Sequence, residues 1–167
     1  MKRGMLTVLA LALLTSLAAC GKEAAPKPVE TPAEAQTYTE ISADGSDLIT
    51  ISTEGITETA RFYNYPSGDV TVQLVALRDA AGEVHIAFNT CQSCSPSPKA
   101  YYRQSGDELQ CANCGFTFAP EEVGLVQGGC NPWPIDGAEI GPEEITLPAA
   151  SLKAMTDRFA SWGGPTK

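Results

Sequence analysis

Two C-x-x-C motifs supply the residues best suited to chemistry. Cys91 and Cys94 form the first motif, and Cys111 and Cys114 form the second after an interval of sixteen residues. Two residues between cysteines let both sulfurs reach one ion from a single tight turn, and two such turns facing each other complete a tetrahedron. Gly115, directly after Cys114, relaxes the backbone where amides turn toward a ligating sulfur. The spacing therefore predicts one metal site with four thiolate ligands.

Other chemistries are open to the same four cysteines. An exported chain meets an oxidising compartment, where the motifs would form disulfides, with Cys91 to Cys114 as one cross-pairing. A thioredoxin-like redox pair is disfavoured, because Pro96 and Pro98 prevent a regular helix from continuing after Cys94. Four thiolates suit zinc or a single iron ion as well as an iron–sulfur cluster. We favour the metal site over the disulfides and the redox pair.

Cys130 and His85 are possible additional metal or thiol residues. Cys130 lies in a Gly- and Pro-rich segment over 128–134, which predicts a rigid turn that presents the thiol at a fixed place. Four interpretations of Cys130 stay open: a fifth sulfur near the metal, a replacement for one of the four ligands, half of a disulfide, or a buried apolar side chain. On an extended strand His85 lies ~20 Å from Cys91, at about 3.3 Å per residue. We therefore interpret His85 as a strand histidine with its own partner.

Composition and charge exclude several classes of protein. The chain has 167 residues with 11 Lys+Arg against 20 Asp+Glu, a net charge of −9. An acidic chain without a basic cluster does not neutralise phosphates, so we expect no nucleic-acid partner. Beyond the N-terminus no apolar stretch reaches about 18 residues, which excludes a multi-span membrane protein. A single histidine, no nucleophile–base pair and no phosphate loop predict that the protein is not an enzyme.

The N-terminus predicts export and a lipid anchor. A basic start followed by an apolar segment over 2–14 is typical of a signal peptide. The Leu-Ala-Ala-Cys-Gly sequence around Cys20 is similar to the lipobox of bacterial lipoproteins. We predict a signal peptide over 1–19, lipidation at Cys20, and a disordered tether over 20–37, which is rich in Ala, Pro, Glu and Lys. The anchor would hold the protein in the bacterial cell envelope, facing the periplasm.

Residues 38–167 form the predicted metal-binding domain, whose class is α+β and mainly β. A β-meander is expected first, from strands over 48–52, 60–65, 70–77 and 84–89. A cysteine-knuckle metal-binding module of loops and short strands follows over 90–135. Apolar residues at i, i+3, i+7 and i+10 then predict one C-terminal helix whose apolar stripe packs on the core; they are Leu152, Met155, Phe159 and Trp162.

Several segments resemble the FtrD-like membrane iron–sulfur proteins associated with bacterial ferrous-iron uptake. The matching segments, which fall within residues 48–135, are Val84–Cys94, Tyr102–Gln104, Gly106–Asp107, Cys111–Gly115, Phe118, Val123–Gly124 and Gly128–Pro132. The resemblance implies a periplasm-facing domain that binds iron or an iron–sulfur cluster through cysteines and passes electrons beside an iron permease or another redox partner. Family members often carry transmembrane helices, and the predicted lipid anchor stands in their place here.

The metal decides between the remaining functional hypotheses. Iron predicts one-electron transfer or iron handling, whereas zinc predicts a structural module with partner binding on the sheet. A reactive thiol at Cys130 predicts a thiol–disulfide or metal-delivery protein. The signal has Lys2 and Arg3 and no twin-arginine pair, so we expect the chain to cross the membrane unfolded. An unfolded chain carries no assembled cluster, which favours a single ion unless a cluster is built after export.

Overall fold

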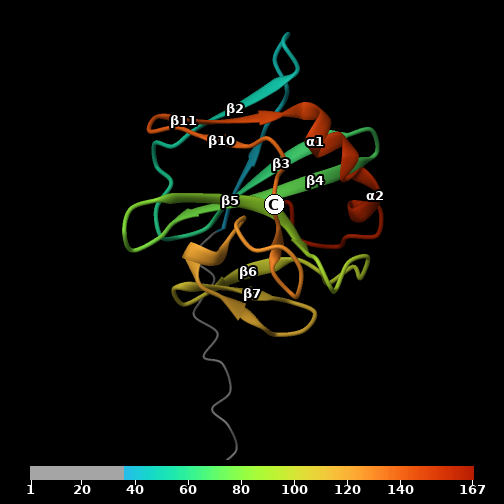
Figure 1. Ribbon diagram of the computed structural model, residues 1–167. Helices are drawn as coiled ribbons and strands as arrows, with labels where there is room; N and C mark the ends of the chain where they lie inside the picture. The colour runs from blue at the N-terminus through green and yellow to red at the C-terminus, as the bar shows by residue number, and fades with distance from the viewer. Residues whose placement is uncertain (1–35) are drawn as a thin grey trace, which may run out of the picture.

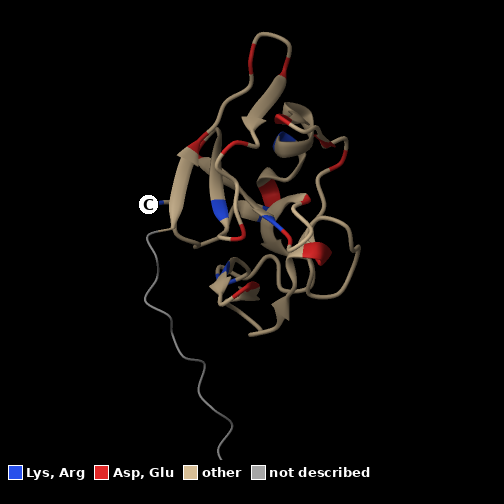
Figure 2. Cartoon of the chain, turned by 90° about the vertical axis from the view of Figure 1, so that its left-hand side faces the viewer, with Lys and Arg blue, Asp and Glu red and all other residues tan. Residues whose placement is uncertain are grey.

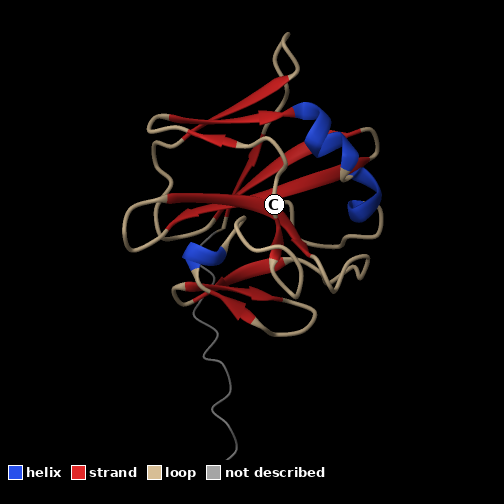
Figure 3. Ribbon diagram, viewed as in Figure 1, coloured by secondary structure: helices blue, strands red, loops and turns tan. Residues whose placement is uncertain are grey.

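The computed structural model describes residues 36–167 of the chain (Figure 1). The predicted signal peptide, the predicted lipidation site Cys20 and the predicted tether up to residue 35 lie outside the described residues. Most elements are strands, and the helices are short (Figure 3). Within residues 36–167 no helix is long and apolar enough to cross a membrane. The mainly β class predicted from the sequence is confirmed.

A five-stranded sheet occupies the middle of the molecule (Figure 1). Its strands, in spatial order, are β1 (Thr37–Glu40), β3 (Arg61–Ser67), β4 (Val70–Arg78), β5 (Val84–Cys91) and β9 (Pro132–Trp133). The antiparallel run β3–β4–β5 is the predicted meander. Its first turn has only two residues, Gly68 and Asp69, and Gly68 takes a φ of 62°, where glycine carries no steric cost. β1, which pairs parallel to β3, was not predicted from the sequence.

A three-stranded sheet covers one face of the central sheet. Its order is β10 (Glu139–Ile140), β11 (Glu144–Pro148) and β2 (Leu48–Ser52). β2 is a strand as predicted, but it pairs with β11 instead of joining the meander. Ile49 and Ile51 alternate with exposed residues along β2, so only one face of this strand is buried. That face packs with the aromatic and aliphatic residues of the central sheet to form the larger apolar core.

The C-terminal helical segment is confirmed, but it consists of two short helices. α1 covers Ala149–Ala154 and α2 covers Thr156–Phe159. At the break, the Met155 amide donates to the carbonyls of both Leu152 and Lys153, and the Thr156 hydroxyl also donates to the Lys153 carbonyl. These bonds tighten the turn and interrupt the regular helix. The predicted apolar stripe nevertheless packs on the core as expected, with Leu152 and Phe159 fully buried.

A smaller sheet lies against the opposite face of the central sheet. It contains β6 (Tyr102–Ser105), β7 (Glu108–Cys111) and β8 (Thr117–Phe118), followed by the single 3₁₀ turn η1 (Pro120–Glu122). Side chains from this sheet meet the reverse face of β3, β4 and β5 in a second apolar core. β5 is therefore buried along its whole length, and its last residue is Cys91. We call the residues from Cys91 to Asn131 the cysteine module, and the remaining described residues the sheet body.

Candidate metal centre

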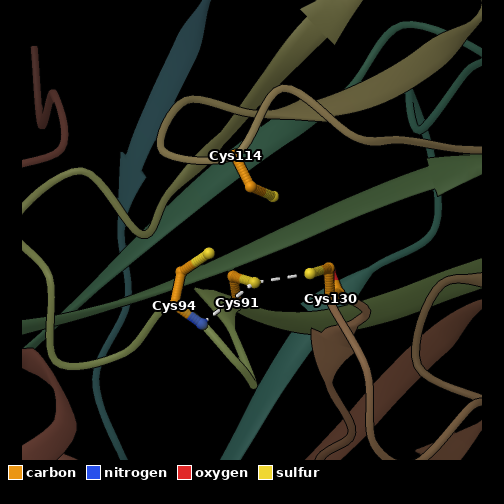
Figure 4. A group of neighbouring side chains, drawn as sticks. All are labelled: Cys91, Cys94, Cys114 and Cys130. Carbon is orange, nitrogen blue, oxygen red and sulfur yellow. Dashed lines mark hydrogen bonds between the residues drawn. The ribbon is translucent and has the colours of Figure 1, made fainter.

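The cysteine module brings five sulfurs together. Within residues 36–167 all five cysteines are free thiols. The Sγ atoms of Cys91, Cys94, Cys114 and Cys130 lie within 4.8 Å of one another (Figure 4). The Sγ atom of Cys111 lies 4.0 Å from that of Cys94. The four residues predicted from the C-x-x-C spacing thus lie together, and Cys130 joins them as a sulfur near the same site.

The two C-x-x-C turns have matching backbone hydrogen bonds, although different residues follow them. In the first turn the Ser95 amide donates to the carbonyl of Cys91 at 3.0 Å. In the second, the Gly115 amide donates to the carbonyl of Cys111 at 2.9 Å. Gly115 has a φ of 78°, a conformation that glycine adopts without steric cost. The first turn closes without a glycine, and there the Cys94 amide also points at the Cys91 sulfur at 3.4 Å.

The two residues inside the first motif fix the position of Cys130. The Gln92 side chain donates to the carbonyls of Val126 and Pro132 and accepts from the Gly128 amide at 2.6 Å. The Ser93 hydroxyl donates to the carbonyl of Gly129. The loop that carries Cys130 is therefore clamped to the turn that carries Cys91 and Cys94. This role was not predicted from the sequence, because the spacing of a C-x-x-C motif gives its middle residues no role beyond separating the cysteines.

Gly124 lets the same loop pass directly over β5. Its φ is 76°, and a Cβ atom at this position would collide with the carbonyl oxygen of Ile86. Only glycine allows both the backbone conformation and the close approach. The loop thereby reaches the strand that ends in Cys91.

Tyr102 is a second residue of the site that the sequence analysis missed. Its buried hydroxyl donates to the carbonyl of Cys130 and contacts the sulfur of Cys91. Its amide donates at 2.7 Å to the side-chain oxygen of Asn89, which is also buried. Tyr102 therefore links β5, β6 and the Cys130 loop. The only signal in the sequence was the position of Tyr102 between the two motifs, and that signal does not specify a contact.

The sulfurs hold their protons unequally because they hydrogen bond to one another. The Cys111 thiol donates to the Cys91 sulfur, which lowers the pKa of Cys91 to about 4 and raises the pKa of Cys111. Burial raises the pKa of Cys94. Burial and the neighbouring Cys114 sulfur raise the pKa of Cys130 to about 12. Five sulfurs this close cannot all carry negative charge by themselves, so a bound cation is needed to keep several of them as thiolates.

The spacing of the sulfurs fits one tetrahedral ion. A metal–sulfur bond of about 2.3 Å places the sulfurs of a tetrahedron about 3.8 Å apart. The observed limit of 4.8 Å and the 4.0 Å contact are close to that value. A sulfide-bridged cluster sets its ligands farther apart, because iron and sulfide atoms lie between them. The donor set fits iron or zinc, and four of the sulfurs lie close enough together to share one ion.

His85 lies apart from the cysteines. Its Nε2 atom is 3.0 Å from the Asp79 carboxylate, and both side chains are largely buried. This hydrogen bond lowers the pKa of Asp79. His85 is the second residue of β5 and Cys91 is the last, so most of the strand separates them. His85 is a strand histidine with a carboxylate partner, as we interpreted it from the sequence.

Comparison with known families assigns most of the described chain. A family model described as "Membrane iron-sulfur containing protein FtrD-like" matches residues 56–159. The matched range begins before β3, ends with α2 and contains all five cysteines of the site. Comparison with curated proteins and with solved structures finds no match.

Proposed function

The chain belongs to the FtrD-like family of membrane iron–sulfur containing proteins, and on that premise we propose that its cysteines hold iron for one-electron transfer or iron handling. The observation that carries the proposal is the gathering of five free thiols at one place. Thiolates prefer soft or borderline metals, which include iron and zinc. When bound, iron supplies a one-electron redox centre.

The residues around the sulfurs support a role that needs access to a partner. Cys91 and Cys111 are fully buried, whereas Cys114 is exposed. The site therefore has a protected side and an open side, and a partner can approach closely at Cys114. The Cys94 amide points at the Cys91 sulfur, and a hydrogen bond of this kind stabilises the more negative, reduced state of a metal–thiolate site.

The rest of the proposal concerns location and partners. We propose that a lipid on Cys20 attaches the protein to the membrane and that the domain faces the periplasm. An iron permease or a membrane redox protein is the proposed partner. Lys and Arg are scattered over separate elements of the described chain (Figure 2), which supports a function without nucleic acid. We propose a carrier of metal or electrons rather than an enzyme.

Metal analysis of the full chain tests this function. The protein is expressed with its own signal, extracted from membranes with detergent and purified under nitrogen. We expect about one iron per chain, thiolate-to-iron absorption bands and no acid-labile sulfide. Iron with equimolar sulfide would replace the single ion by a cluster. Zinc alone in cells supplied with iron would contradict the redox role.

A Cys20→Ser variant tests the proposed anchor separately. We expect this variant to leave the membrane fraction while it keeps its metal, because Cys20 belongs to neither C-x-x-C motif. Continued membrane attachment of the variant would contradict the lipid anchor.

A further inference from the structure

The site has one sulfur more than a tetrahedral ion needs. Cys130 belongs to a group of four whose sulfurs are within 4.8 Å of one another, together with Cys91, Cys94 and Cys114. Cys111 lies outside that group, although its sulfur contacts all three of these partners. Cys111 and Cys130 are therefore the two sulfurs that lie apart. The five sulfurs form two overlapping sets of four, which share the triangle of Cys91, Cys94 and Cys114.

The two unshared sulfurs have different surroundings. Cys111 ends β7 and is fully buried in the second apolar core, among side chains of the central sheet. Cys130 is partly exposed and lies in the loop before β9. The set with Cys111 is thus an inner position, and the set with Cys130 is an outer position next to solvent.

We propose that Cys130 and Cys111 exchange as the fourth ligand, so that an ion enters and leaves through the outer position and is retained at the inner one. This inference rests on the proposed function, because it requires that the cysteines bind a metal. It adds a route for transfer of the ion to or from a partner. Cys91, Cys94 and Cys114 keep hold of the ion throughout.

The exchange needs little movement. With metal–sulfur bonds of about 2.3 Å, the centres of two tetrahedra that share a face are about 1.5 Å apart. Two ions do not fit at that separation, so one ion occupies one position at a time. In the inward step the Cys130 sulfur loses its bond to the ion and the Cys111 sulfur gains one. The Cys111 thiol gives up its proton and the Cys130 sulfur takes one up, so the charge balances and no oxidation state changes.

Hydrogen bonds of the chain hold both Cys130 and Cys111 in place, so neither residue needs a bond to the metal for its position. Cys130 is fixed by the Tyr102 hydroxyl on its carbonyl and by the Gln92 and Ser93 bonds to its loop. Cys111 is fixed by its amide, which donates to the carbonyl of Phe116 at 2.9 Å. Neither sulfur has to be recruited from elsewhere, so the exchange is a step between two prepared positions.

Matched single variants of the full chain in detergent, loaded anaerobically with Co²⁺, test the exchange. We expect Cys130→Ser and Cys111→Ser each to bind one Co²⁺ per chain with four-coordinate spectra, because each keeps one set of four. Transfer of Co²⁺ to an excess of chelator should slow by about tenfold in Cys130→Ser and quicken by about tenfold in Cys111→Ser. The double variant should lose tight binding. Cys111→Ala, which adds no polar atom to the buried site, should behave like Cys111→Ser.

Three results would overturn the exchange. One is loss of Co²⁺ binding in only one of the two single variants, Cys130→Ser or Cys111→Ser. That result would show that the site has one fixed set of four ligands. Another is an unchanged transfer rate in Cys130→Ser. The third is retention of tight binding by the double variant. Failure of the unaltered chain to bind any metal is a different outcome, since it would contradict the proposed function itself.

Discussion

The sheet body and the cysteine module are built in different ways. In the body, β3 and β4 pair over seven residues and bury a continuous apolar core. In the module, the longest strands have four residues, and Phe116 and Leu125 are more than half exposed. Apolar burial is sufficient to explain the body. The module shares the second apolar core with the central sheet, but it also depends on turns, side-chain bonds to backbone carbonyls and the group of sulfurs. Its stability should therefore depend on the metal more than that of the body does.

The largest expected effect is the one that metal removal has on the module alone. Structural metal binding by cysteine sites contributes on the order of 10 kcal/mol. After anaerobic chelation, we expect amides of β7 and of the Cys130 loop to exchange rapidly with deuterium. Amides of β4 should remain protected. Equal loss of protection in β4 and β7 would show that the two regions form one unit.

A substitution in the core of the body should destabilise the body and leave the metal site intact. Leu74 is fully buried in the larger core, and Leu74→Ala should lower the free energy of unfolding by about 3–5 kcal/mol. Leu125→Ala, at an exposed position of the module, should change the free energy of unfolding by less than about 0.5 kcal/mol. Denaturant unfolding measures both. Metal content should remain normal in each variant below its unfolding midpoint, and a loss of metal in Leu74→Ala would contradict independent stabilisation.

Tyr102 joins the two regions, so its hydroxyl offers an intermediate test. Tyr102→Phe removes the donor in the part-buried hydrogen bond to the Cys130 carbonyl and should cost about 1–3 kcal/mol. It should also speed metal release, because the Cys130 loop loses one of its attachments. Tyr101→Phe is the matched control, since that ring packs edge-on against Trp162 in the body. Equal rates of metal release in the two variants would show that the Tyr102 hydroxyl does not help to hold the metal site.

The smallest expected effect concerns Asp79 and His85 in the body. The hydrogen bond from His85 lowers the pKa of Asp79, and the amides of Ala81 and Glu83 also donate to its carboxylate. A lowered folded-state pKa contributes stability that is present above the unfolded value of about 3.9 and is lost as pH falls through the folded value. Asp79→Asn should flatten this acid-side loss in thermal unfolding without changing metal content. An unchanged dependence of thermal stability on pH in the acid range would show that the Asp79–His85 hydrogen bond does not contribute to stability.

The sequence predicts the body better than the module, for physical reasons. Alternating apolar residues are a local signal, and they located β2, β3, β4 and β5. The pairing of β2 with β11 depends on residues more than ninety positions apart and has no local signal. β1 has only four residues, none fully buried, and was missed. Local spacing located the two C-x-x-C turns, whereas the clamp from Gln92 to the Cys130 loop is a long-range contact.

The most direct test of the central claim is the native mass of the full chain, purified anaerobically in detergent with its five module cysteines intact. We predict the mass of the lipidated chain plus one metal ion, less the protons that the ligating thiols release. The mass of a metal-free chain, reduced by two hydrogens for each disulfide, would contradict the account. It would show that up to four of the five sulfurs pair as disulfides instead of sharing an ion.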